Sequence, residues 1–244
     1  MEGGSAEAKV EQKEGQPGWD EYALLHARRP SGDEDVQHRI RIKQVPGSGT
    51  TGGIVWNAAK VLLQLLGAEE GEGGIRVGGR RVMDLGSGTG LLGLVENVAL
   101  NLRALPEGSV EPEVQALEWG GEVAHLTPPF DLVVCSDLVF CAHNAGCLPA
   151  LLHTILILSE EGTEVVVAFQ ERLGWIEARF MEEVKRHFGR CREVEISEAA
   201  LQRATAREGE EEFEGMSSMF HEDIGMHVYL LSHKLSSPSP SPSS

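Results

Sequence analysis

The sequence predicts an α/β fold in which a mostly parallel β-sheet is covered by helices on both faces. Three observations support this fold class. Continuous apolar runs, typical of buried strands, alternate with stretches in which apolar residues recur at helical spacing. A glycine-rich turn joins an early apolar run to a helical stretch, and the last two strand-like segments can pair as an antiparallel hairpin.

The two ends of the chain differ in composition from the rest. Residues 1–20 are rich in Gly, Glu and Lys, and the last ten residues are mostly Ser and Pro, so neither end has the apolar content to offset its ordering entropy. Of the 244 residues, we therefore expect 1–35 to be disordered or extended, 36–234 to form a single domain, and 235–244 to be a disordered tail.

The chain is acidic, with 38 Asp and Glu residues, 21 Lys and Arg residues and a formal net charge of −17. This charge repels phosphate backbones and argues against nucleic acid as a partner, whereas a basic protein or a cationic ligand is compatible with it. Acidity that serves solubility alone is the alternative. No apolar run approaches the ~18 residues of a membrane span, and residues 1–20 lack the apolar core of a signal peptide. We expect a soluble cytoplasmic protein, with the nucleus as a second candidate location and no membrane partner.

Cysteine and histidine do not indicate a metal site. The four cysteines form no C-x-x-C motif, and Cys135 lies inside an apolar run as a small core residue of a reducing compartment. The nine histidines are scattered, and His221 and His227 have no third ligand near them in the sequence. We therefore predict no bound metal.

The first half of the chain contains an exposed hairpin strand, a helix and the strand before the glycine turn. Residues 39–43 alternate basic and apolar side chains and predict a short strand in an N-terminal hairpin. Residues 54–66 predict an amphipathic helix that ends at Gly67, and residues 81–85 predict a buried strand. A helix over residues 91–105 follows the glycine turn.

The second half continues the alternation. Residues 114–119 predict a second core strand, and the most apolar strand comes next. The most apolar strand is expected at residues 130–137 and is followed by a helix at 146–158. A further strand is expected at 163–169, and a further helix at 175–188. Residues 192–196 and 226–231 close the sheet as an antiparallel hairpin.

The turn Gly86-Ser87-Gly88-Thr89-Gly90 is the first sign of a ligand site. Glycines at this place allow the backbone to approach a ligand closely, at the edge where open sheets bind. Residues 88–93 also fit the dinucleotide pattern G-x-G-x-x-G. Asp84 instead makes the motif D-x-G-x-G-x-G, and an acid there favours a ligand with an ammonium group and no phosphate, such as S-adenosylmethionine, over NAD. A tight turn without any ligand is the third interpretation.

Five motifs in a fixed order resemble those of the seven-β-strand protein-lysine methyltransferases of the methyltransferase-like group. They are Thr51–Ala59, Asp84–Gly93, Val95–Asn101, Leu117–Gly120 and Phe130–Phe140. That group includes the lysine methyltransferases of the valosin-containing protein, heat-shock proteins and elongation factors, and the resemblance covers about residues 38–232. It implies a class I, Rossmann-like methyltransferase fold, S-adenosylmethionine as cofactor, and a non-histone protein substrate such as a chaperone, an ATPase or a translation factor. We expect a monomer.

The resemblance also implies which residues form the site. Those expected at the cofactor are Trp56, Asp84, Gly86, Ser87, Gly88, Gly90, Trp119 and Ser136. Among them Trp56 would pack at the entrance and Trp119 would flank the adenine, although either tryptophan could be plain core. Asp137 and Phe140, in the position of the family's D-x-x-Y motif, are expected to be catalytic; here phenylalanine keeps the aromatic wall and lacks the hydroxyl.

The implied chemistry is the direct displacement of a methyl group by a neutral amine. Free lysine has a pKa of about 10.4, so neutralising it at pH 7 costs roughly 4–5 kcal/mol. A carboxylate and backbone carbonyls can hold the amine, and aromatic walls exclude water and favour its methylated cationic forms.

One part of the family pattern is missing. Leu94 runs directly into Val95, where relatives continue through the rest of a helix, a second strand and an acid that holds the ribose, about two dozen residues by resemblance. A splice form, an error in the gene model or a true deletion would produce this join. We expect residues 114–119 to fill the vacant place beside 81–85, with Glu118 replacing the lost acid in part. An inactive binding protein with the same fold is the alternative function.

Overall fold

The computed structural model describes residues 19–24, 38–43, 55–67, 74–87, 112–205 and 225–235. The chain divides into two compact units, and each is described by itself. The first unit comprises Met1–Arg76, Gly86–Gln115 and Glu195–Ile224, and the second comprises Val77–Leu85, Ala116–Val194 and Gly225–Ser244. Within the described residues no helix is both long and apolar enough to span a membrane.

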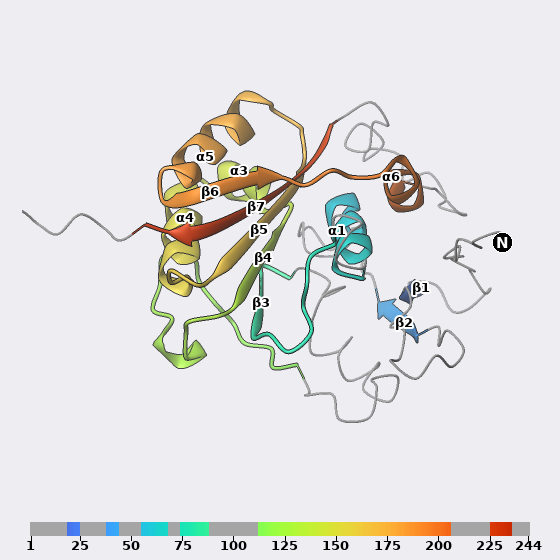
Figure 1. Cartoon of the computed structure of the whole chain (residues 1–244), viewed down its shortest axis with the longest axis horizontal. Coiled ribbons are helices and arrows are strands. Elements are labelled where there is room, and N and C mark those ends of the chain that lie inside the picture. The colour runs from blue at the N-terminus through green and yellow to red at the C-terminus, as the bar shows by residue number, and fades with distance from the viewer. Residues whose placement is uncertain are drawn as a thin grey trace, which may run out of the picture. The chain divides into compact units, whose positions relative to one another are not determined.

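The second unit is built on a five-stranded sheet with the order β3-β4-β5-β7-β6 (Figure 1). Its strands are β3 (Val82–Leu85), β4 (Leu132–Ser136), β5 (Glu164–Gln170), β6 (Phe188–Glu193) and β7 (Met226–Lys234). β4 pairs in parallel with both β3 and β5, and β7 pairs antiparallel with both β5 and β6. Four of the five strands therefore run in one direction, which confirms the mostly parallel sheet and the antiparallel pairing of the last two strands. The strand expected at 192–196 lies at 188–193 instead.

Three helices pack on one face of this sheet (Figure 1). They are α3 (Leu138–Asn144), α4 (Leu148–Leu158) and α5 (Trp175–Lys185). Alternate strand residues such as Val133 and Val167 share a core with them. The strand residues between these, such as Val134 and Val166, are buried as well. Burial on both faces explains why the strands read as continuous apolar runs rather than as alternating ones.

Helix α3 was not predicted. The sequence expectation was a helix from residue 146, which matches α4, whereas α3 starts directly after Asp137 at the end of β4. Gly146, with φ at +69°, lies between the two helices. A seven-residue helix is too short for helical periodicity to show in the sequence, so this element escaped detection. A short 3₁₀ turn, η3 (Ala124–Leu126), precedes β4.

The predicted strand over residues 114–119 is wrong, and so is its pairing with residues 81–85. Residues 113–118 adopt no regular secondary structure, and in the part of the chain that the structure describes β3 pairs with β4 alone. Leu117 and Trp119 instead pack against the core with their side chains. Glu113 and Glu118 are exposed, so only part of the segment can be buried and a two-sided core strand is disfavoured. The replacement of the lost acid by Glu118 rested on this pairing and loses its basis.

The first unit contains a hairpin and two helices among its described residues. β1 (Trp19–Leu24) pairs antiparallel with β2 (His38–Lys43), which confirms the N-terminal hairpin; β1 lies inside the segment 1–35. α1 (Asn57–Gly67) contacts α6 (Glu198–Thr205), and its buried residues include Ala58, Val61, Leu62 and Leu65. The helix expected at 91–105 and the tail beyond residue 235 lie outside the described residues.

Candidate functional site

The carboxyl ends of β3, β4 and β5 meet at one edge of the sheet, called the carboxyl edge below. Asp84 lies near the end of β3, Ser136 and Asp137 lie at the end of β4, and Gln170 ends β5. Open α/β sheets bind their ligands just outside this edge. Predicted site residues of the second unit therefore gather where the fold class places a ligand.

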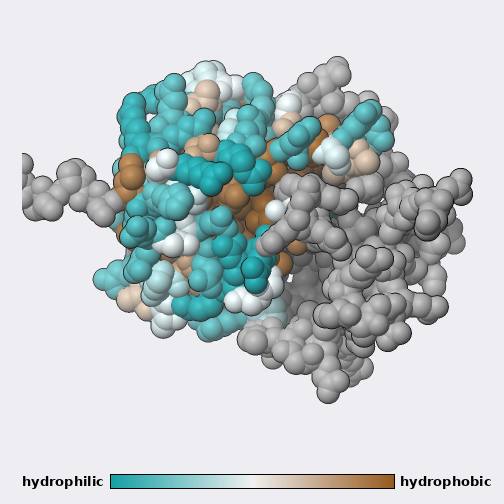
Figure 2. All heavy atoms as spheres, viewed as in Figure 1, coloured by the Kyte–Doolittle hydropathy of each residue, from teal (hydrophilic) through white to brown (hydrophobic). Residues whose placement is uncertain are grey.

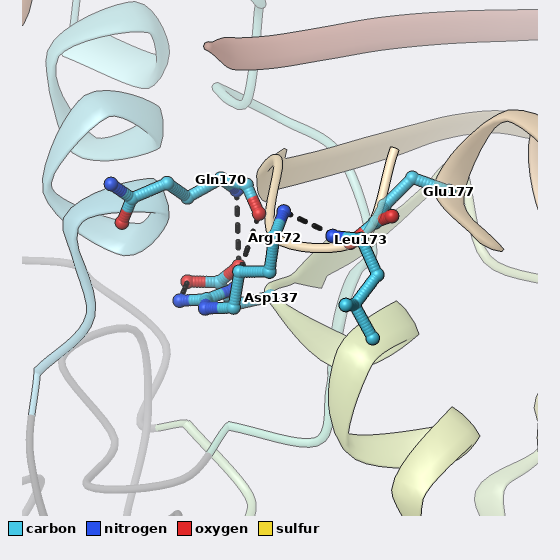
Figure 3. Close-up of polar contacts among 5 residues, drawn as sticks. All are labelled: Asp137, Gln170, Arg172, Leu173 and Glu177. Carbon is cyan, nitrogen blue, oxygen red and sulfur yellow. Dashed lines mark hydrogen bonds and ion pairs between the residues drawn. The ribbon is translucent and has the colours of Figure 1, made fainter. Parts of the chain in front are cut away.

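Asp137 is a buried carboxylate fixed in a left-handed backbone conformation, with φ at 57° and ψ at 25°. Its backbone N–H donates to the carbonyl of Ala168, 2.8 Å away. Arg172 Nη1 lies 2.7 Å from Oδ1 and Nη2 lies 3.1 Å from Oδ2, and the Gln170 N–H donates to Oδ1 at 3.1 Å (Figure 3). Both oxygens of Asp137 are thus engaged by the protein itself, and only 3% of this side chain and 7% of Arg172 are exposed.

Arg172 connects the two residues that were predicted to be catalytic. Its guanidinium carbon lies 5.2 Å from the centre of the Phe140 ring, while the same group binds Asp137. Phe140 is on α3, three residues after Asp137. Sequence reasoning missed Arg172, although its signal was available: a charged residue follows closely on an apolar strand, as Asp137 does.

The segment after β5 is held by consecutive backbone hydrogen bonds. The Glu171 N–H donates to the Gly225 carbonyl at 2.8 Å. The N–H groups of Arg172 and Leu173 both donate to Oε1 of Glu177, at 3.2 and 3.4 Å, and Glu177 is buried on α5 (Figure 3). Because the Gln170 N–H is bound to Asp137, all four residues from 170 to 173 have a bonded backbone N–H.

Asp84 is a buried acid with an unsatisfied oxygen. Its Oδ2 has no hydrogen-bond partner among the described residues, and burial raises the pKa of this carboxyl to about 7. Cys135 lies on the neighbouring strand, and burial together with the nearby Asp84 raises the pKa of its thiol far above the usual range, so it stays a neutral core residue. A cationic ligand group beside Asp84 would favour its charged form.

A second unsatisfied polar atom lies at the end of the neighbouring strand. Ser136 Oγ is buried and makes no hydrogen bond to the part of the chain that the structure describes. Gly86 follows β3 with φ at +71°, a conformation that glycine adopts without strain. Ser87 is half-buried, while Gly88 and Gly90 lie outside the described residues. Buried polar atoms without partners are rare, so two of them on adjacent strands fit a polar ligand at this edge.

The two predicted tryptophans lie in different units. Trp119 belongs to a turn of the second unit, packs against the core, and is followed by Gly120, whose N–H donates to Thr154 Oγ1 at 2.7 Å. Trp56 precedes α1 in the first unit, and its carbonyl accepts the N–H groups of Ala59 and Lys60. Their contact with a cofactor stays a prediction. Among the described residues no three His, Cys, Asp or Glu side chains gather as a metal site.

Comparison with known proteins identifies similar chains. The family model described as lysine methyltransferase matches residues 34–100 and 94–187. Protein N-lysine methyltransferase METTL21A of Danio rerio is 32% identical over 174 residues, covering 63% of this chain and 76% of that protein. The Xenopus tropicalis protein of the same name is 30% identical over 173 residues with the same coverage.

A solved structure is also similar. It is the T. Thermophilus 16S rRNA N2 G1207 methyltransferase (RsmC) in complex with AdoMet and guanosine. The TM-score is 0.42 and the identity 16%, with coverage of 90% of this chain and 52% of that chain.

The comparisons also bear on the join at Leu94–Val95. The two matches to the family model meet at residues 94–100, which contain the predicted join. In addition, 63% of this chain is about 154 residues, so about 20 of the 174 positions compared with the Danio rerio protein have no counterpart here. Both observations agree with an internal stretch that relatives have and this chain lacks.

Proposed function

The chain belongs to the lysine methyltransferase family, and from this premise we propose that it transfers a methyl group from S-adenosylmethionine to a lysine of a non-histone protein. The observation that carries this proposal is the pair of buried, unsatisfied oxygens of Asp84 and Ser136 at adjacent strand ends, next to the glycine turn. An acid and a hydroxyl there suit the ammonium and hydroxyl groups of this cofactor better than a pyrophosphate.

The residues proposed to hold the cofactor are those of the carboxyl edge and the glycine turn. Asp84 would bind the ammonium group, and Gly86, Ser87, Gly88 and Gly90 would let the backbone approach the methionine part. Ser136 would donate or accept a hydrogen bond at the end of β4. Contacts of Trp56 and of Trp119 with the cofactor are proposed from the family resemblance alone.

The protein's own contribution to the reaction is to accept a neutral amine and align it. When bound, S-adenosylmethionine supplies an electrophilic methyl carbon, so the lysine nitrogen forms the new bond while the carbon–sulfur bond breaks and a thioether leaves. Desolvation of the amine against the Phe140 ring would favour its neutral form, because burial disfavours the charged form of an amine. The Arg172 guanidinium beside this ring is already compensated by Asp137. Asp137 is already bound to Arg172, so we propose that it fixes α3 and the Phe140 wall rather than taking the amine's proton. The proton leaves to solvent.

The join at Leu94–Val95 favours a second candidate function. If the lost stretch removes the cofactor's ribose contact, the chain would be a binding protein that keeps the methyltransferase fold. The two partial matches to the family model are the observation behind this alternative.

The partner and location follow as further proposals. We propose a protein substrate, with a chaperone, an ATPase or a translation factor as the candidate classes, and a monomeric enzyme that does not bind nucleic acid. The net charge of −17 supports the last point. The four cysteines are all free, which supports a reducing, cytoplasmic location with the nucleus as a second candidate.

Isothermal titration of the full chain with S-adenosylmethionine tests the proposal. Micromolar binding, together with methyllysine in protein incubated with the enzyme and cofactor, is the expected result; no binding would support the inactive alternative, and binding of NAD would indicate an oxidoreductase. Gly86→Arg should abolish binding. Gly78→Arg is the matched control, because a side chain at Gly78 meets nothing within 4 Å and its turn precedes β3 at the opposite edge of the sheet. If Gly86→Arg binds normally, the glycine turn is not the site.

A further inference from the structure

Two large apolar side chains are exposed beside the candidate site. Leu173 is 39% exposed and Trp175 is 65% exposed, the highest value among the exposed large hydrophobic residues of the described chain. Leu173 follows Arg172 directly, and Trp175 comes two residues later as the first residue of α5. Hydrophilic side chains cover most of the face that Figure 2 shows, and a hydrophobic area lies near its centre.

Trp175 has no role in the core that would explain it. Helix α5 packs on the sheet through one side, formed by Ile176, Phe180, Met181 and Val184. Trp175, the first residue of the helix, lies on the opposite side and faces water. Within the part of the chain that the structure describes, the indole of Trp175 makes an edge-on contact with the His143 ring of α3, with centroids 5.8 Å apart and an interplanar angle of 81°. This contact orients the indole without burying it.

The backbone of residues 170–173, which leads to these side chains, is held in place by hydrogen bonds. Every backbone N–H from Gln170 to Leu173 is bonded, Arg172 is clamped on Asp137, and the Ile176 N–H donates to the Leu173 carbonyl at 2.9 Å. The side chain of Leu173 points away from the Asp137–Arg172 pair (Figure 3). A surface that is already ordered loses little conformational entropy when it binds a partner.

Helix α3 places this surface next to the aromatic wall of the site. Phe140 contacts Arg172, and His143, three residues later on the same face of α3, contacts Trp175. Three residues of helix rise about 4.5 Å. Adding the 5.8 Å between the His143 and Trp175 ring centres gives a path of about 7–10 Å from Phe140 to Trp175. An extended peptide advances about 3.3 Å per residue, so a chain whose lysine lies at Phe140 would bring a residue two or three positions away to Trp175.

We propose that Leu173 and Trp175 form a docking surface for the substrate protein, and that it binds a large apolar side chain two or three residues from the target lysine. This rests on the proposed function and deepens it. Tryptophan, with tyrosine and arginine, is enriched at the interface positions that contribute most of the binding energy. The neighbouring Glu171, 44% exposed, and the net charge of −17 complement a segment that carries positive charge besides its lysine.

The test uses the full chain and synthetic nonapeptides with one central lysine in a Gly/Ser/Arg background. A single leucine is moved through the positions on either side, and alanine replaces it in the reference peptide. For the wild-type enzyme, KM should be about tenfold lower with leucine two or three positions from the lysine than with alanine. Trp175→Ala should remove this preference while the KM of the reference peptide and the Kd for S-adenosylmethionine stay the same, and Leu173→Ala should reduce it.

Leu235→Ala is the matched control, because Leu235 is 50% exposed but follows β7 at the opposite edge of the sheet. It should keep the preference. A preference that survives in Trp175→Ala, or an equal loss of kcat for all peptides, would overturn the proposal. So would a dimer of the wild-type chain that Trp175→Ala converts to a monomer in sedimentation, since the occupant would then be a second copy.

A measurement without turnover separates this proposal from the proposed function. Peptide binding is followed by intrinsic fluorescence with S-adenosylhomocysteine present. Leucine-dependent quenching that is lost in Trp175→Ala would support the surface even if no methyl transfer occurs, and quenching that does not depend on leucine would refute it even if methyl transfer does.

Discussion

The Arg172 guanidinium holds the Asp137 carboxylate through two hydrogen bonds of 2.7 and 3.1 Å, in a place where both side chains are almost wholly buried. The same guanidinium covers the Phe140 ring. One residue that follows β5 thus orients the end of β4, the start of α3 and the aromatic wall of the candidate site.

Arg172→Gln should destabilise the fold by about 3 kcal/mol, because it leaves a buried carboxylate without its partner. Urea denaturation monitored by circular dichroism measures this. The control is Arg80→Gln, since Arg80 and its partner Glu164 are 24% and 29% exposed at the opposite edge of the sheet. It should cost less than about 1 kcal/mol. In a double-mutant cycle with Asp137→Asn, the two losses should not add; additive losses would mean that the pair does not act as a unit.

Asp84 predicts a pH-dependent stability. Its folded pKa of about 7 lies above the ordinary value of 3.8, so the folded state binds this proton more tightly than the unfolded state does. The resulting stability is fully present below pH 3.8 and is lost as pH rises to about 7. Asp84→Asn does not titrate, so relative to the wild type it should gain up to about 4 kcal/mol between pH 4 and pH 8. Denaturation curves at the two pH values check this, and an equal difference at both would contradict it.

Cofactor affinity should rise with pH through the same group. An ammonium beside Asp84 binds the carboxylate form, so S-adenosylmethionine should bind about tenfold more tightly at pH 8 than at pH 6, with release of up to one proton. Titration calorimetry in two buffers of different ionisation enthalpy counts that proton. Asp84→Asn should bind more weakly at pH 8 and lose the pH dependence. A wild-type affinity that is the same at both pH values would place the ammonium elsewhere.

Thr154 tests the role of the Trp119 turn. Thr154→Val removes the acceptor of the Gly120 N–H, which should cost about 1–2 kcal/mol and loosen the turn. If Trp119 flanks the cofactor, the Kd for S-adenosylmethionine should rise about fivefold. Ser159→Ala is the comparison, because the buried hydroxyl of this residue, which directly follows α4, donates to the Ile155 carbonyl in the last turn of the helix at 2.6 Å. It should lower the melting temperature without changing Kd, and equal effects of the two variants on Kd would argue against a role for Trp119.

The sequence predicted the elements whose pattern is set by burial. The apolar runs that became β4 and β5 are buried on both faces, so any register would keep them in the core, and the predicted limits differ from the observed ones by two residues or fewer. The segment 114–119 has apolar side chains at 114, 116, 117 and 119, and those at 117 and 119 pack against the core. Those two side chains reach the core from a turn anchored on α4, a tertiary contact that no local pattern encodes.

The candidate site was predictable in position but not in its contacts. The sequence indicates Asp137 as a site residue because a carboxylate directly after an apolar strand is costly to bury without a partner. In the structure that partner is Arg172, 35 residues further along the chain. Partners at such a separation come together only through the sheet order, in which β4 and β5 are neighbours. For Trp175 the sequence predicts only the start of a helix, because the exposure of a side chain cannot be inferred from the identity of one aromatic residue.

The position of β7 has a consequence for how the protein folds as it is made. β7 is the last strand of the sheet in chain order, yet it lies between β5 and β6 and is the strand with which β6 pairs. While the chain emerges from the ribosome, the edges of β5 and β6 that will pair with β7 therefore stay unpaired until residues 226–234 are released. At about 5–20 residues per second, synthesis exposes these edges for seconds, an interval in which chaperones would have to shield the nascent domain.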